Sequence, residues 1–192
     1  MANIATDTTD HDLIAQFKEG SMEAMEAIVD RYENRIFNFG LKMCGQFQDA
    51  EDITQDTFLN AFRYLDNFRE ETKLKSWLFK IVYNLTMDFL RKQSLQHSYQ
   101  ESLNSHVSEV NSLERSLLAA EQKKQLHQAL FDLPERQRTA LTLFLVNGLS
   151  GREVASVLEL SIEASDSLLA RARRNLKKTI QQESQIKKAA NL

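Results

Sequence analysis

Five cations near the end of the chain are the residues whose spacing most directly indicates chemistry. They are Arg171, Arg173, Arg174, Lys177 and Lys178. Such a run on one helix can neutralise the phosphates of a nucleic acid. It can equally be a solvated helix face whose cations lie at the negative end of the helix dipole. The cluster alone therefore leaves nucleic-acid binding and an ordinary surface helix both open.

The segment 150–176, which contains the start of this cluster, has the pattern of a helix-turn-helix. Ser150 and Glu153 have the spacing of a capping box for one helix, and Ser161 can cap a second helix after a short turn. The small residue Ala155 suits the place where the two helices approach each other. The core residues that we expect here are Val154, Leu158, Leu160, Ile162, Leu169, Ala172 and Leu176. The second helix of such a motif enters a major groove, so the pattern favours DNA binding.

Residue types that usually carry catalysis or metal binding are few and scattered. The histidines are His11, His97, His106 and His127, and the only cysteine is Cys44. None has the spacing of a metal site or a catalytic triad, and the sequence contains no glycine loop of the kind that cradles phosphate. We therefore expect no enzyme, no metal and no other cofactor, and we interpret Cys44 as a small core residue.

The composition predicts an all-α protein made of two small helical domains. The chain of 192 residues has one proline and five glycines, whereas the turns of a β-protein draw heavily on both. Apolar residues recur at steps of three and four, as in helices that bury one face. The predicted helices span about 12–19, 22–44, 49–65, 73–93, 113–131, 134–147, 151–158 and 162–182.

Several residue types predict where these helices begin and end. Ser21 and Asp49 are candidate N-caps, and Pro134 suits the first turn of a helix. Gly45 and Gly148 suit helix ends. The polar stretch 66–72 is predicted to be a loop.

Residues 95–112 differ in amino-acid composition from the segments on either side. They are rich in Ser, Asn, Gln and His, with few apolar residues, and predict a flexible linker. The domains are accordingly predicted at 12–94 and 113–182, with a tail at 183–192. No apolar run approaches the ~20 residues of a membrane helix, and the N-terminus has no apolar signal region. We therefore expect a cytoplasmic protein without membrane insertion of its own.

Four sequence blocks follow one another in an order that is typical of one family. They are DAEDITQDTF (49–58), KSWLFKIVYNLTMDFLRKQ (75–93), LPERQRTALTL (133–143) and GLSGREVASVLELS (148–161). Over about residues 12–93 and 113–180 the chain resembles the extracytoplasmic-function (ECF, group IV) RNA polymerase sigma factors. The resemblance implies that the chain binds core RNA polymerase and directs promoter recognition, DNA opening and transcription initiation at a restricted set of promoters. It also implies an anti-sigma factor that covers the polymerase-docking surface.

The same resemblance assigns three surfaces. The polymerase-docking surface is Asp49, Glu51, Asp52, Gln55, Asp56 and Phe58. The −10 surface is Phe68, Lys73, Lys75, Trp77, Lys80, Asn84 and Arg91. The −35 surface is Arg152, Ser161, Glu163, Ser165, Asp166, Ser167, Arg171 and Arg174. Within the −10 surface we expect Trp77 to pack in the core rather than stack on a base, and Phe68 to pin the loop.

The last predicted helix departs from the family pattern at its start. Asp166 and Leu168 replace a usual basic pair, Ser165 stands at a usually aliphatic position, and Glu159 stands where the turn usually has glycine. Either Glu159 adopts a left-handed conformation or the turn differs. Two alternatives to a sigma factor are a stand-alone helix-turn-helix regulator, which would be a dimer on a palindromic site, and a helical protein-interaction module.

Overall fold

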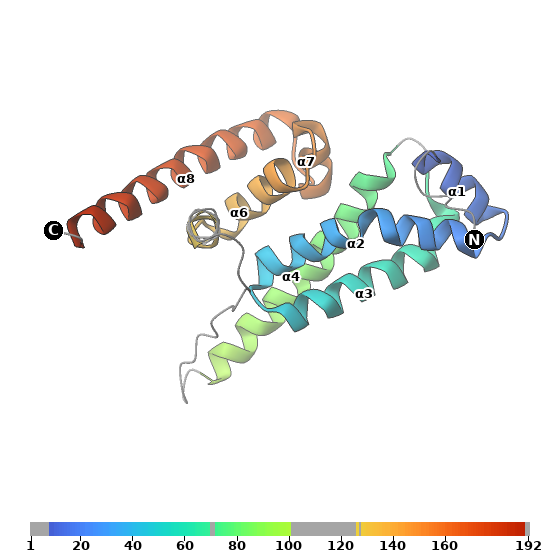
Figure 1. The fold of residues 1–192 in the computed structure, drawn as a ribbon, viewed down its shortest axis with the longest axis horizontal. Coiled ribbons are helices and arrows are strands. Elements are labelled where there is room, and N and C mark those ends of the chain that lie inside the picture. The colour runs from blue at the N-terminus through green and yellow to red at the C-terminus, as the bar shows by residue number, and fades with distance from the viewer. Residues whose placement is uncertain (1–7, 70–71, 101–125, 127, 191–192) are drawn as a thin grey trace. The chain divides into compact units, whose positions relative to one another are not determined.

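The computed structural model describes residues 8–69, 72–100, 126 and 128–190, and all regular structure in these ranges is helical. The chain divides into two compact units, residues 1–108 and 109–192, and each is described by itself (Figure 1). The predicted all-α fold with two small helical domains is confirmed. No helix in the described part of the chain is long and apolar enough to cross a membrane.

The N-terminal unit is built around one long central helix. Its elements are α1 (Asp10–Lys18), α2 (Met22–Cys44), α3 (Phe47–Tyr64), a 3-10 turn (Leu65–Asn67) and α4 (Leu74–Gln100). Helix α2 packs against α1, α3 and α4. In the core, the fully buried Phe39 and Phe79 meet edge to face with ring centroids 6.0 Å apart, a contact worth about 0.5–1.5 kcal/mol beyond the area that it buries.

Helix α2 approaches α3 closely at Gly40. A Cβ added at Gly40 would lie 3.4 Å from Cα of Ala50, which is itself fully buried. A Cβ at position 40 would therefore be in ordinary van der Waals contact with Ala50, so this point of the interface is closely packed. This spacing brings α3 close enough to α2 to bury the inner side of α3.

Helix ends in the N-terminal unit agree with the prediction at α2 and differ at α3. The Ser21 hydroxyl accepts a hydrogen bond from the Ala24 N–H, and Gly45 ends α2 with φ 78°. The prediction that Asp49 caps α3 is wrong, because α3 begins at Phe47 and Asp49 lies in its first turn. Phe47 contacts the Phe37 ring at 5.0 Å, and this apolar contact explains the earlier start. Cys44 is buried, as predicted.

Helix α4 runs further than predicted. It continues to Gln100 instead of ending near Gln93, so the predicted start of the linker at residue 95 is also wrong. The stretch contains no glycine or proline, the two residue types that most strongly end a helix. The rest of the predicted linker, residues 101–112, lies outside the described residues, as do residues 113–125 of the predicted helix 113–131.

The C-terminal unit comprises residues 126 and 128–131, which are helical, and four further elements. These are α6 (Glu135–Leu141), a π-helical segment (Thr142–Val146), α7 (Gly151–Leu158) and α8 (Ile162–Ala190). Helices α6 and α7 both pack on α8. Leu141, Leu143, Leu149 and Val154 form the centre of its core and are at most 2% exposed.

The caps of this unit are close to those predicted. Pro134 precedes α6 as its N-cap, one residue earlier than the predicted helical position. Gly148 has the expected positive φ of 64°. The capping box of Ser150 and Glu153 is confirmed, and the Ser161 hydroxyl accepts from the Ala164 N–H. Glu159 adopts φ 54°, ψ 47°, so the turn keeps its left-handed residue even though glycine is absent.

Two predictions for α8 and its surroundings are wrong. The helix continues to Ala190 rather than ending near Gln182, so residues 183–190 of the predicted tail are helical. Leu160 is only half-buried and Ile162 is 45% exposed, whereas Val157 is buried at 1% exposure. Apolar spacing across a turn does not indicate which side of the turn faces the core, and this side is settled only when the two helices pack.

Candidate nucleic-acid and protein interfaces

Helix α3 divides sharply into a buried side and a polar exposed side. The buried residues are Ala50, Ile53, Thr54, Thr57, Phe58 and Ala61. Glu51, Asp52, Gln55 and Asp56 are all exposed. Asp49 is half-buried, and its pKa is raised by burial and, second, by the nearby Asp52 charge. The exposed side therefore presents three carboxylates and an amide that suit a basic protein partner.

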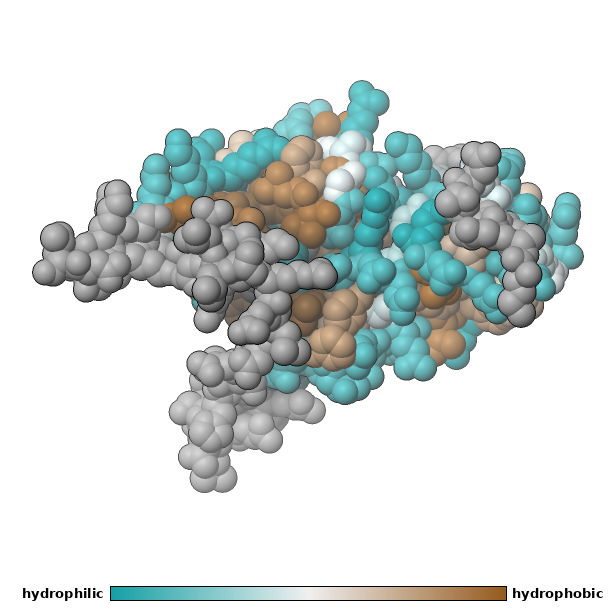
Figure 2. Space-filling view, viewed as in Figure 1, coloured by the Kyte–Doolittle hydropathy of each residue, from teal (hydrophilic) through white to brown (hydrophobic). Residues whose placement is uncertain are grey.

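Apolar side chains extend this acidic surface towards the C-terminal end of α3. Leu59 is 46% exposed and Phe62 is 44% exposed. Leu59 follows Asp52, Gln55 and Asp56 at helical spacing, so these four residues share one face. Figure 2 shows hydrophobic surface next to hydrophilic surface in this region of the N-terminal unit. An acidic face with an adjoining apolar spot is a surface that can both attract and hold a partner.

One face of α4 carries the aromatic, cationic and amide residues of the predicted −10 surface. Lys73, Trp77, Lys80, Asn84 and Arg91 recur at steps of three, four and seven residues, and therefore share a side of the helix. Asn84 and Arg91 are exposed, whereas Trp77 and Lys80 are half-buried.

An acid that the sequence reasoning missed also lies on this face. Asp88 accepts a hydrogen bond from the Arg91 guanidinium at 3.1 Å, and both side chains are more than half exposed. The signal was available in the sequence, because the two residues are three apart on a helix. The positive charge that Arg91 could offer to a nucleic acid is therefore already paired with the Asp88 carboxylate.

Phe68, which precedes α4, is held by packing. Phe68 is buried and meets Trp77 edge to face at 5.4 Å. The ammonium of Lys18, at the end of α1, donates to the Phe68 carbonyl at 3.2 Å. Phe68 is buried as expected, and the half-buried Trp77 packs against it. Phe68 is consequently not an accessible stacking platform in this structure.

A pocket opens beside this loop, between α1, α2 and the start of α4. It has a volume of about 410 Å³ and is lined by Asp10, His11, Ile14, Tyr32, Phe68, Thr72, Lys73, Leu74 and Lys75. The contribution of α1 was not predicted from the sequence. It depends on the packing of α1 against α2, which no local motif encodes.

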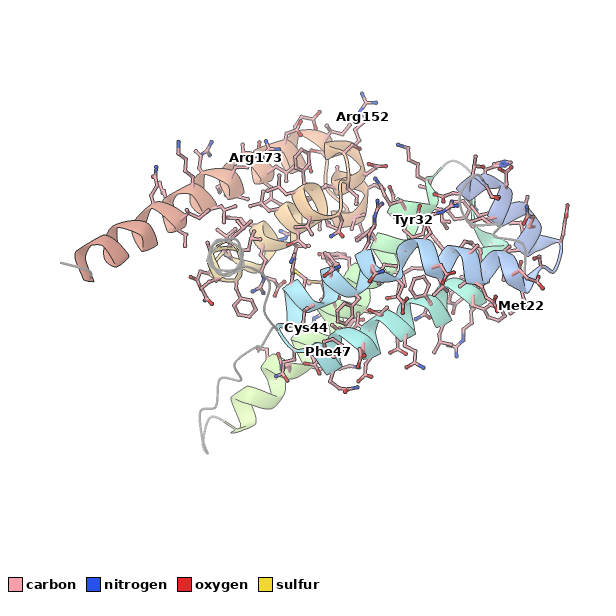
Figure 3. The ribbon with its side chains drawn as sticks, in the orientation of Figure 1. Met22, Tyr32, Cys44, Phe47, Arg152 and Arg173 are labelled. Atoms are coloured by element: carbon pink, nitrogen blue, oxygen red, sulfur yellow. The ribbon has the colours of Figure 1, made fainter. Side chains whose placement is uncertain are left out.

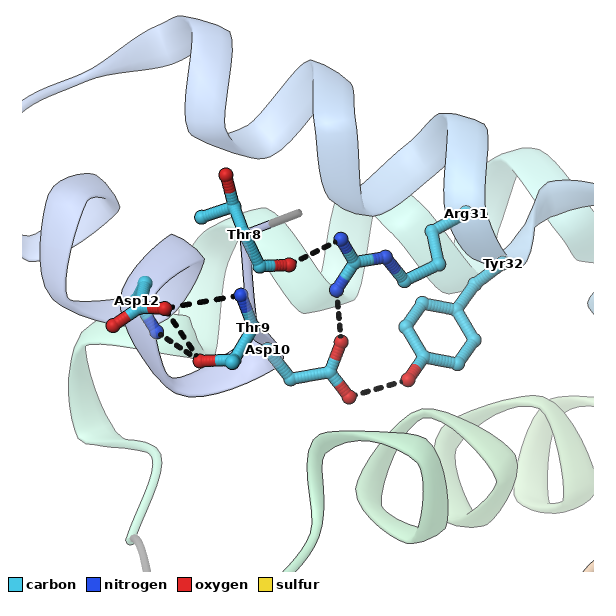
Figure 4. A network of polar contacts seen from close by, with 6 residues as sticks. All are labelled: Thr8, Thr9, Asp10, Asp12, Arg31 and Tyr32. Atoms are coloured by element: carbon cyan, nitrogen blue, oxygen red, sulfur yellow. Dashed lines mark hydrogen bonds and ion pairs between the residues drawn. The ribbon is translucent and has the colours of Figure 1, made fainter. Parts of the chain in front are cut away.

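A network of polar contacts fixes α1 to α2 at one wall of this pocket (Figure 4). Arg31 donates to the Asp10 carboxylate at 2.6 Å and to the Thr8 carbonyl at 2.6 Å. Tyr32 donates its hydroxyl to the other Asp10 oxygen at 2.5 Å. Burial and the Asp10 contact together raise the pKa of Tyr32 above its ordinary value, so the phenol stays protonated as the donor. The start of α1 is thereby held in place.

The C-terminal unit contains the predicted helix-turn-helix. Ala155 is buried where α7 meets α8, as expected from its small size. Arg152 is exposed and projects from the start of α7, whereas the Arg173 guanidinium lies over the Phe144 ring at 4.6 Å (Figure 3). Arg173 is therefore engaged in packing. All five cations of the cluster, Arg173 included, are exposed.

Known proteins share both halves of this arrangement. The sigma-70 region 2 model matches residues 28–96, and the sigma-70 region 4 model matches residues 123–176. The two models together cover more than half of the chain, in the order of the two units.

The chain belongs to the ECF sigma factors.

Relatives with this family name align over nearly the full length. The ECF RNA polymerase sigma-E factor of Haemophilus influenzae is 26% identical, covering 93% of this chain and 98% of the relative. The ECF RNA polymerase sigma factor SigW of Bacillus subtilis is 28% identical, with coverages of 87% and 94%. CnrH, solved in complex with the cytosolic domain of CnrY, has a TM-score of 0.69 at 26% identity, covering 90% of this chain and 97% of its own.

This sigma factor thus binds core RNA polymerase and directs initiation at specific promoters, and the alternative of a stand-alone regulator is excluded.

The RpoE–NepR complex from Bartonella quintana supports the fold alone, with a TM-score of 0.72 at 22% identity over 83% of this chain and 98% of its own. Region 2 includes the α3 and α4 surfaces described above, and region 4 includes α7 and the start of α8.

The structure brings most of the predicted site residues to the surface and turns three away from it. The first is Phe68, described above. The second is Phe58, which is 9% exposed and lies on the buried side of α3. Ser165 is fully buried and donates its hydroxyl to the Gly151 carbonyl at 3.3 Å. Leu168 is half-buried, and the usually aliphatic inner position is occupied by Ser165 itself.

Proposed function

We propose that this sigma factor, as a group IV member acting in the cytoplasm, docks on core polymerase through the exposed side of α3. The observation that supports this assignment is the division of α3 itself. Glu51, Asp52, Gln55 and Asp56 are exposed, while the opposite side is buried against α2 and α4. Four polar residues with no role in the core of their own unit are available to a partner. Exposed Leu59 on the same face adds apolar area to the docking surface.

The two DNA surfaces are assigned within the predicted domains, 12–94 and 113–182. Lys73, Lys75, Lys80 and Asn84 would contact the −10 element as it opens, with Trp77 and Phe68 supporting the loop from within. Cationic side chains can follow the backbone of a single strand, and Asn84 presents an amide to base edges. In region 4, Arg152, Arg171 and Arg174 would contact the −35 duplex. Ser161, Glu163, Asp166 and Ser167 lie near the start of the same recognition helix.

An anti-sigma factor is proposed as a further partner. CnrH, the structural neighbour described above, was solved with the cytosolic domain of CnrY. The exposed face of α3 offers such a partner the same residues that core polymerase needs, so the two partners would compete. Competition for one surface would silence the factor without any change in its fold.

Charge reversal on α3 tests the docking assignment. We expect Asp52→Lys to lower polymerase-dependent run-off transcription about thirtyfold, because a lost interfacial charge pair and a new repulsion cost about 2 kcal/mol or more. The matched control is Asp30→Lys, which places the same reversal on an exposed position of α2. Equal activity of the two variants, with equal binding to core polymerase, would show that α3 is not the docking surface.

A further inference from the structure

The start of the recognition helix carries the wrong charge for a DNA backbone. Glu163 and Asp166 are exposed in its first turns, and Glu159 is exposed in the turn before it. The exposed cations come later, at Arg171, Arg173, Arg174, Lys177 and Lys178. The DNA-facing side of region 4 is therefore divided between an acidic start and a basic continuation.

Glu163 and Asp166, the exposed acids in the first turns of α8, have different surroundings. Glu163 is held at the start of its own helix, where hydrogen bonds from its own backbone N–H and, second, from Ser161 lower its pKa. Asp166 reaches the neighbouring helix instead. A Cβ added at Gly151 would lie 3.1 Å from Oδ1 of Asp166. The Asp166 carboxylate thus contacts the first residue of α7, a helix of eight residues.

A buried hydrogen bond joins α7 and α8 next to Asp166. The buried Ser165 hydroxyl donates to the Gly151 carbonyl at 3.3 Å, so the residue beside Asp166 is tied to the same point on α7. Because Ser165 is fully buried, the first turns of α8 cannot rotate away without breaking the core. The position of the Asp166 backbone therefore follows from packing rather than from solvent-exposed contacts.

The first N–H groups of a helix lack intrahelical partners and form its positive end, which favours a negative group nearby. In proteins that bind DNA, helix N-termini commonly donate to phosphate oxygens. The capping box accounts for the N–H groups of Ser150 and Glu153. The N–H groups of Gly151 and Arg152 belong to the same first turn of α7, whose first residue the Asp166 carboxylate contacts.

We propose that Asp166 limits the affinity of region 4 for duplex DNA, by placing a fixed negative charge at the start of α7 where a DNA phosphate would otherwise bind. The inference rests on the assignment of α7 and α8 to the −35 duplex. Arg152 is exposed in the first turn of the same helix. Duplex binding by the free chain is consequently weak, and productive contact requires core polymerase to hold region 4 near the DNA.

The test compares Asp166→Asn with the unaltered full-length chain in binding to a fluorescent promoter duplex, over a series of salt concentrations. Asparagine keeps the size of the side chain and removes its charge. We expect binding to tighten about fivefold. We also expect the slope of log K against log salt to steepen by about 0.9, since one more phosphate contact forms. A purely structural role for Asp166 would change the melting temperature and leave the slope unaltered.

Two further variants separate this inference from the −35 assignment. Glu163→Gln removes a neighbouring charge that is engaged at its own helix start, and is expected to change affinity less than Asp166→Asn. Arg171→Ala combined with Arg174→Ala should weaken duplex binding if α8 faces the DNA. If the double arginine variant weakens binding while Asp166→Asn leaves it unchanged or weaker, Asp166 is not a limit on affinity. If neither variant alters binding, the −35 assignment fails and the inference fails with it.

Discussion

The surfaces assigned to DNA in the two units are built from different kinds of side chain. On α4, Trp77 and Lys80 are half-buried, and the adjoining loop is held by the contact between Phe68 and Trp77. On α8, the side chains beyond Ser165 that face outward are mostly charged and exposed. A surface that must capture unstacked bases benefits from a rigid, partly apolar support. A surface that contacts duplex backbone needs charge in the right place, and in this chain the charge is divided.

Removing the ring of Phe68, which packs against Trp77 of the −10 surface, should have the largest effect. We expect Phe68→Ala to lower the free energy of unfolding by about 3–5 kcal/mol, because a buried ring is lost together with its contact to Trp77. Denaturant unfolding of the full-length chain measures this change. Phe131→Ala, at a position that is 42% exposed in the other unit, serves as the control. A loss as small as that of the control would mean that the loop does not depend on Phe68.

Removing the amide of Asn84 should affect promoter opening and spare the fold. Asn84 is exposed, so Asn84→Ala is expected to leave the melting temperature unchanged while lowering open-complex formation about threefold to tenfold, the cost of one hydrogen bond. Permanganate reactivity of the opened strand reports on this step. Asn34→Ala, at an exposed position on α2, is the matched control. Unchanged opening in Asn84→Ala would remove Asn84 from the DNA surface.

Removing cations from α8 should weaken duplex contact alone. Arg171→Ala together with Arg174→Ala is expected to reduce the salt slope of promoter binding by about 1.8, or about 0.9 for each lost phosphate contact. Binding of the polymerase complex to a single-stranded −10 oligonucleotide should not change. Equal losses on duplex and single strand would contradict the division of labour between the two units.

The smallest effect is expected at the ion pair on α4. Asp88→Asn frees Arg91, yet the pair is exposed and contributes only about 0–1 kcal/mol to stability. We expect unfolding to be nearly unchanged and affinity for the single strand to rise about twofold as one repulsive charge is removed. A measurable fall in that affinity would show that Asp88 itself contacts the strand.

The identity of the helices and most of their ends could be predicted because the signals are local. Ser21, Gly45, Gly148, Ser150 and Ser161 act within one or two turns of their own positions, so a short stretch of sequence contains all the partners. The helix-turn-helix and the two-sided character of α3 follow from apolar spacing for the same reason. Asp52, Gln55 and Asp56, which the family resemblance assigned to a surface, are exposed.

Other features were decided only by the packing of distant segments. Phe47 starts α3 early because it meets Phe37. Asp10 becomes part of a pocket because α1 packs beside Arg31 and Tyr32, some twenty residues along the chain. These contacts join residues whose relative positions are set by helix packing, and local spacing carries no information about them.

The start of α8 shows most clearly which features the sequence determined and which the packing of helices decided. The sequence by itself determined that Ser165 and Asp166 open a recognition helix with an unusual lack of positive charge. Only the tertiary structure decided that Ser165 points inward to the Gly151 carbonyl, while the Asp166 carboxylate lies at the start of α7. Neighbouring residues on a helix differ by about 100° in direction, so the orientation of α8 on α7 determines which of the two is core and which is surface.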